Sequence, residues 1–350
     1  MKKIILFLLM IVSVSSYAEE LPLDVYGVDG ITKTKILHTL GDEIRRYAEE
    51  MKKINMSNAE PTQSKKQTLK MQKKQLLKKV HSFGNFAFVK FSPVFYPGVR
   101  KVYLTIDIVT KHDRNRIPKS KKRLIKHLKN NDSELKLLYK LWSDYVTHNN
   151  NLMYQEGYVN KMKSCPFVHC IWGFDKSEEK KYVKKFREIA NHKASVLMEQ
   201  IRFSPNQQQR ADAIFLLAHA DDYNKTASFL AHFIDDNDSV VRNNVMRVLG
   251  GIVFKHNVKN IPLAKIIKAL DYPYVTDRNK AASILFGLVN NDKMYHKEIL
   301  TKAGPTLIKL LALKQPNNHD FAYLILKKIS HKDYSELDME SWKKWMKNNS

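Results

Sequence analysis

The sequence contains none of the short motifs that mark the common enzyme active sites. It has no G-x-S-x-G, no P-loop, no G-x-G-x-x-G and no H-E-x-x-H segment. The nucleophile elbow, the two phosphate-binding loops and the zinc-protease helix that these motifs build are therefore excluded. The 13 histidines are scattered along the chain. We expect no catalysis, no resident metal and no cofactor.

Long apolar runs are also scarce. Residues 4–12 form an apolar run that follows Lys2 and Lys3 and is followed by small residues up to Ala18. This order is typical of a secretory signal peptide, and the run is too short to span a bilayer. No later segment approaches 18 uninterrupted apolar residues. We expect residues 1–18 to be cleaved and the mature chain to work in a bacterial periplasm or outside the cell; an uncleaved anchor is the alternative.

Cysteine is almost absent, with only Cys165 and Cys170. Two cysteines this close in an exported chain favour a local disulfide, whose short loop fixes local geometry more than it stabilises the fold. Two alternatives stay open: a pair of free thiols, or a metal site that adds His169. The metal site would have only three ligands and lacks the second pair that structural zinc sites use.

Acidic residues are few for a chain of this length. Asp and Glu number 35 against 60 Lys and Arg, so the formal net charge is +25. A field of this sign attracts anionic partners, which outside the cytoplasm include acidic proteins, lipid headgroups, anionic glycans and nucleic acid. A compositional bias towards lysine is the alternative explanation, because net charge governs solubility and non-specific association before specific function.

The stretch DSVVRNNVMRVLG at residues 238–250 carries the clearest pattern in the chain. Its apolar residues recur at helical spacing, and Asp238 and Ser239 stand where an N-cap belongs. Similar stretches begin near residues 206, 275 and 318. From them we expect four helix pairs and a final capping helix at 339–345; the pairs are 192–203 with 206–220, 224–234 with 239–254, 262–270 with 276–290, and 295–313 with 318–330.

Three arginines occupy equivalent positions at the start of the second helices of these pairs. They are Arg210, Arg242 and Arg278, which are 32 and 36 residues apart. The pattern of Asp, a β-branched residue, Arg and then alternating Ala and Leu resembles the HEAT repeat. The resemblance implies that residues 191–350 form an α-solenoid with a C-terminal cap, in which these arginines brace neighbouring repeats. Such arrays build surfaces and rarely carry chemistry.

Residues 19–113 have the pattern of a small α+β domain. We expect an extended segment at 23–28, helices at 32–53 and 65–81, and strands at 85–92 and 99–110. This order, with VYGVDGITKTKIL at residues 25–37, resembles the POTRA domain. The resemblance implies a periplasmic module that accepts a partner strand at a sheet edge.

Residues 114–190 have the pattern of a basic helical connector that contains the cysteine pair. We expect helices at 119–129, 133–147 and 151–163, the middle one with an apolar stripe that includes Leu138 and Trp142. The basic faces are either solvated surface or a footprint for nucleic acid or a membrane.

Together these patterns predict a mainly α protein, with a HEAT-like α-solenoid preceded by a small α+β domain and a helical connector. The predicted function is a scaffold or protein-binding module whose partner is another protein of the envelope or of a host. The alternative is a binder of nucleic acid, lipid headgroups or anionic glycans. The candidate contact residues lie off the apolar stripe of the second helices, so the core does not dictate them: Asn243, Arg247, Asn279 and Lys280. An ordinary solvated helix face is the alternative for each.

Overall fold

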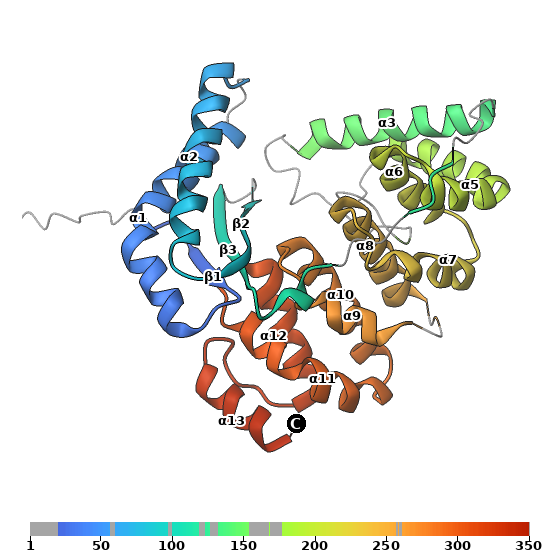
Figure 1. The fold of residues 1–350 in the computed structure, drawn as a ribbon. Coiled ribbons are helices and arrows are strands. Elements are labelled where there is room, and N and C mark those ends of the chain that lie inside the picture. Colours follow the sequence, from blue (N-terminus) through green and yellow to red (C-terminus); the bar gives the residue numbers. More distant parts are fainter. Residues whose placement is uncertain are drawn as a thin grey trace, which may run out of the picture.

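A computed structural model describes residues 20–56, 60–96, 100–118, 123–126, 132–153, 168, 177–256, 258 and 261–349. In these residues the chain is mainly helical and carries one small three-stranded sheet (Figure 1). The expected signal peptide at residues 1–18 and both cysteines lie outside this part, so the cleavage and the disulfide stay predictions. Of the helices described, none is both long and apolar enough to cross a bilayer.

The first part of the chain has the predicted β-α-α-β-β order. Its elements are β1 (Leu23–Tyr26), α1 (Gly30–Asn55), α2 (Gln63–His81), β2 (Phe86–Tyr96) and β3 (Lys101–Thr110). The strand order is β1-β3-β2, with β1 parallel and β2 antiparallel to the central β3. β2 runs beyond the predicted end at residue 92, because it pairs with β3 as far as Tyr96 opposite Lys101.

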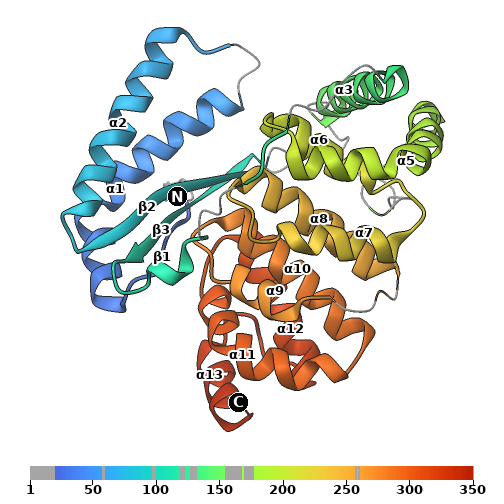
Figure 2. The same ribbon diagram turned by 45° about the vertical axis from the view of Figure 1, so that its right-hand side comes forward.

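The two faces of this sheet are both covered, and they differ in chemistry. Alternate residues such as Phe91, Leu104 and Ile106 form a hydrophobic cluster with α1 and α2. The opposite face carries buried polar side chains and lies against the helices of the second half (Figure 2). An antiparallel sheet often turns its polar face to water. Here that face is buried, so each polar group on it needs a partner.

The helices after the sheet form a unit that we call the helical array. They are α3 (Ser133–Met153), α5 (Ser177–Phe203), α6 (Gln207–Leu217), α7 (Tyr223–Leu230), α8 (Ser239–Lys255), α9 (Leu263–Ala269), α10 (Val275–Asn291), α11 (Met294–Leu311), α12 (Pro316–Ser330) and α13 (Met339–Asn349). Two 3-10 helices, η2 (Arg114–Arg116) and η3 (Ala231–Phe233), complete the described elements. All four predicted helix pairs and the final helix are present.

Short polar side chains begin several of these helices. The Asp238 side chain accepts a hydrogen bond from the amide of Val240 at the start of α8, and Asn206 accepts one from Gln209 at the start of α6. Such caps satisfy backbone amides that a helix leaves without an internal partner. The N-cap predicted at Asp238 is confirmed.

The second helices of the pairs, α6, α8, α10 and α12, pack one against the next, and each also packs against the first helix of its own pair. One hydrophobic cluster runs through the array from Leu135 in α3 to Trp342 in α13. Trp342 of α13 is completely buried, and α13 contacts α11; the capping of a solenoid stays a prediction from the sequence. The core therefore includes α3, which contacts α5 and α6.

The region between the sheet and the first helix pair differs from expectation in two places. The helix predicted at 119–129 is wrong for residues 123–126, which are not helical; there the Lys126 amide donates to Phe203 O at 3.1 Å. α5 begins at Ser177 rather than near residue 192, because Phe186 and Ile189 continue its apolar stripe into the core. Of the helix predicted at 151–163, residues 151–153 belong to the end of α3 and the rest lies outside the described residues.

Candidate binding surface

Two arginines on successive second helices make the same set of hydrogen bonds. Arg242 Nε donates to Asp277 Oδ2 at 2.8 Å, and Arg278 Nε donates to Asn318 Oδ1 at 2.7 Å. In both cases Nη1 donates to the backbone carbonyl six residues earlier. Each arginine therefore ties the loop before its own helix to the next second helix.

Arg210 in α6 makes a different set of contacts. Its Nε donates to Ile201 O at 2.8 Å, and its two terminal nitrogens pair with the carboxylate of Asp236 in the loop before α8. Arg210, Arg242 and Arg278 are all buried, and each joins one helix pair to the next. A buried guanidinium needs such partners, because an unpaired charge in the interior is strongly destabilising.

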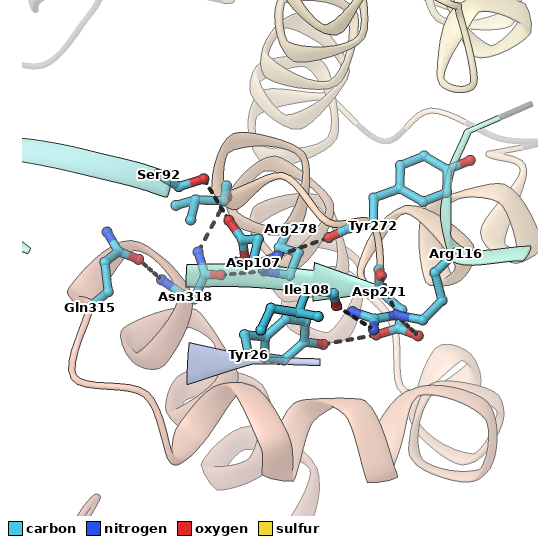
Figure 3. A network of polar contacts seen from close by, with 11 residues as sticks. Tyr26, Ser92, Asp107, Ile108, Arg116, Asp271, Tyr272, Arg278, Gln315 and Asn318 are labelled. Atoms are coloured by element: carbon cyan, nitrogen blue, oxygen red, sulfur yellow. Dashed lines mark hydrogen bonds and ion pairs between the residues drawn. The ribbon is translucent and has the colours of Figure 1, made fainter. Parts of the chain in front are cut away.

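The partners of Arg242 and Arg278 differ in charge. Asp277 brings a carboxylate to Arg242, whereas the equivalent Asn318 brings a neutral amide to Arg278. The missing negative charge comes from the sheet. Arg278 Nη2 donates to Asp107 Oδ1 at 2.7 Å, and both side chains are fully buried (Figure 3). β3 therefore completes the charge balance of α10.

Further polar contacts surround this ion pair (Figure 3). Within the sheet, Ser92 Oγ of β2 donates to Asp107 Oδ2 of β3 at 2.5 Å and so holds the carboxylate that faces Arg278. Tyr26 OH donates to Asp271 Oδ1 at 2.8 Å, and Arg116 Nε lies 3.0 Å from Asp271 Oδ2. Burial raises the pKa of Tyr26, so its hydroxyl stays a neutral donor. We call these contacts, together with the buried ion pair, the seam.

A hollow of about 620 Å³ opens beside the seam. Its wall combines Tyr26, Arg116 and Asp271 of the seam with charged side chains of both signs, such as Asp29 and Lys309. Asp271 is already paired with Arg116, and Asp29 caps the start of α1. Asp271 and Asp29 therefore have structural roles, and we assign no binding site to the hollow.

The structure places the four predicted contact residues on two neighbouring helices. Asn243 and Arg247 lie on α8, Asn279 and Lys280 on α10, and the two helices pack against each other. The expectation of an exposed side chain is wrong for Asn279, which is only 5% exposed and donates from Nδ2 to Asn317 O. α12 covers this side chain, so Asn279 contributes to packing between helices. Asn243, Arg247 and Lys280 are half-buried.

Arg247 and Lys280 differ from the other buried cations of the second helices. Arg247 Nε is buried and has no hydrogen-bond partner, and among the described residues neither side chain has an ion pair. Burial lowers the pKa of Arg247. Burial, with the positive charge of Arg247 beside it, also lowers the pKa of Lys280 to about 8. Lys280 Nζ donates to the neutral side-chain oxygen of Asn279 at 2.7 Å.

The described residues leave the predictions about the cysteine pair untested. In those residues no group of three His, Cys, Asp or Glu side chains is placed to hold a metal ion. Cys165, His169 and Cys170 lie outside them, so the disulfide and its two alternatives remain as the sequence leaves them.

The seam is the feature that the sequence prediction missed. Two signals for it are present in the sequence. Asn318 stands where the pattern set by Arg242 and Asp277 would place an aspartate, and Asp107 interrupts the strand of highest β-propensity with a charge. Neither signal points to the other residue, because 210 residues lie between Asp107 and Asn318 in the sequence. The fold brings both side chains to Arg278.

Comparison with known proteins adds no family to this picture. No family model, no curated protein and no solved structure matches the chain. The resemblances to HEAT repeats and to the POTRA domain therefore stay predictions from the sequence, and the function has to be argued from the contacts above.

Proposed function

We propose that this chain is an exported binding module without catalysis of its own, in which HEAT-like helix pairs hold a partner protein against α8 and α10. The observation that carries the proposal is a contrast between cations. Arg210, Arg242 and Arg278 are each balanced by a carboxylate. Arg247 and Lys280, on the same row of helices, have no such partner among the described residues.

Half-buried charges without a counter-ion destabilise a folded chain. Residues that break a packing rule in this way are expected at functional sites, where binding compensates for the loss of stability. The seam supports the same conclusion, since buried contacts hold the sheet and the array as one body. A partner would therefore meet a preorganised surface and little ordering entropy would be lost on binding.

A second candidate is a binder of anionic polymers or lipid headgroups. The net charge of +25 favours it. The two candidates differ in their response to salt. A polyanion that neutralises many lysines is released steeply as salt rises, whereas a complementary protein interface keeps its apolar and hydrogen-bonded contacts.

Affinity capture from an envelope extract tests the proposal. The bait is the chain from residue 19 onwards, compared with Arg247→Gln/Lys280→Gln and with the control Lys297→Gln/Lys344→Gln, which removes the same charge at two exposed lysines. We expect a discrete protein that the wild type and the control retain at high salt and that the first variant releases. Recovery of polyanions alone, lost with salt from all three baits, would replace the protein-binding proposal by the second candidate.

A further inference from the structure

We infer that Arg247 and Lys280 form an anchoring site for one acidic side chain of the partner, in the manner in which Arg278 already receives Asp107 from the sheet. The inference rests on the proposed function and deepens it. It names the group that the site takes, a carboxylate carried on a segment of another protein, and it names the two side chains that bind it.

The first step is the register of the two helices. A Cβ at Gly250 of α8 would lie 3.6 Å from Ile284 Cγ1 of α10, and one at Gly287 of α10 would lie 2.8 Å from Val253 Cγ1 of α8. Both contacts match α8 residues with α10 residues 34 positions later. The same offset sets Arg247 beside the turn that carries Lys280. The electrostatic effect of Arg247 on Lys280 agrees with this proximity.

The second step is the positive charge of the two side chains, which no carboxylate of the described chain balances. Arg247 Nε has no acceptor. Lys280 donates to the neutral oxygen of Asn279, which leaves its positive charge without compensation. A carboxylate of the partner has two oxygens, one for each cation, and charge-assisted hydrogen bonds of this kind are about twice as strong as neutral ones.

The third step is the precedent inside the molecule. Every other buried arginine of the second helices meets an aspartate: Arg210 meets Asp236, Arg242 meets Asp277 and Arg278 meets Asp107. The last of these aspartates does not belong to the array but is delivered by β3. The array therefore already accepts a carboxylate from a separate structural unit, and Arg247 with Lys280 is the position at which no part of the described chain delivers one.

The anchoring role and a structural role predict opposite effects on stability. If the site waits for a partner, Arg247→Gln removes an unbalanced charge, and the free protein should keep or gain stability. Arg242→Gln is the matched comparison on the same helix. It breaks a buried pair and should lower the midpoint of urea unfolding clearly.

Binding is tested on the chain from residue 19 onwards with a hexaglutamate peptide as the probe, at low salt. Lysine side chains carry 13C and 15N labels, and the Lys280 resonance, assigned from Lys280→Gln, is followed against pH. We expect the bound peptide to raise the pKa of Lys280 above its value of about 8 in the free protein. Arg247→Gln should lower the affinity for the peptide at least about tenfold, which is the effect of losing a hydrogen bond to a charged group. The exposed-site control Lys297→Gln should stay within about twofold.

Inorganic phosphate and vesicles of an anionic phospholipid are the competing probes. The inference is overturned if the peptide binds Arg247→Gln and Lys297→Gln alike, if Lys280 does not respond to it, or if phosphate or vesicles bind more tightly than the peptide at this site. It is also overturned if Arg247→Gln loses as much stability as Arg242→Gln. A captured envelope protein that Arg247→Gln/Lys280→Gln still retains would leave the proposed function standing and the anchoring site refuted.

Discussion

Among single residues, His219 sets a pH dependence of stability. It is buried against the ring of Phe186, with ring centroids 5.1 Å apart. Burial lowers the pKa of His219 from 6.5 to about 4. The unfolded chain therefore binds this proton more readily than the folded chain. The stability that neutral His219 contributes is complete above about pH 6.5 and is lost as the pH falls towards 4.

We expect His219 to remove about 2 kcal/mol from the free energy of unfolding between pH 7 and pH 5. Urea unfolding of the wild type and of His219→Gln at both pH values measures this contribution as a difference. The comparison between the two chains is needed because burial raises the pKa of Asp277 to about 6, which acts in the opposite direction in both. Equal pH dependence in the two chains would contradict the prediction.

At the level of the element, α8 carries two adjacent glycines whose surroundings differ. A Cβ at Gly251 would lie 2.1 Å from the backbone oxygen of Val168, whereas at Gly250 the nearest side chains are 3.6 Å away. Gly251→Ala should therefore force Val168 off the helix and lower the free energy of unfolding by about 1–3 kcal/mol. Gly250→Ala should be neutral or should stabilise α8 by up to about 1 kcal/mol.

Thermal unfolding of the two variants beside the wild type tests this pair, and each glycine serves as the control for the other. A similar change in both variants would mean that Val168 does not lie on α8 in solution.

For the molecule as a whole, the seam predicts that the sheet and the array unfold together. Asp107→Asn leaves Arg278 buried without a carboxylate, and we expect a loss of about 3–5 kcal/mol. Adding Asn318→Asp returns a carboxylate to Arg278 from within the array. It also removes the hydrogen bond from Asn318 Nδ2 to Val275 O, so it should recover only part of the loss.

Urea unfolding followed by tryptophan fluorescence and by far-UV circular dichroism measures both effects. Coincident transitions in the wild type and separate ones in Asp107→Asn/Asn318→Asp are expected, because the double variant balances the array without the sheet. Two transitions in the wild type would show that the seam does not couple the two parts.

Local patterns explain which parts of the fold the sequence predicts. Helical spacing and caps such as Asp238 act within a few residues, so the four helix pairs are correctly predicted. The alternation in β3 shows that one face of the strand is apolar, but it does not show what covers the polar face with Asp107. Periodicity places Asn279 off the apolar stripe and so predicts that it is exposed, but it does not reveal that α12 covers this side chain.

The sequence limits the candidate site for the same reason. It shows that the apolar stripe does not need Arg247 and Lys280, and the structure adds their proximity and the absence of a described counter-ion. Those properties depend on the packing of α8 against α10 and on the choice of partner at each arginine, which no local pattern encodes.

The polar face of the sheet also sets an order of assembly. During synthesis the N-terminal part emerges first, and its own apolar residues are already enclosed between the sheet and α1–α2. Its other face mixes polar side chains such as Asp107 with aromatic ones such as Tyr26 and Phe88, which pack against the array, so this face is covered only when the array has formed. Arg278 cannot find its counter-charge until Asp107 is in place. The part that supplies Asp107 is therefore synthesised before the helices that depend on it. We expect a circular permutant that reverses this order to fold more slowly.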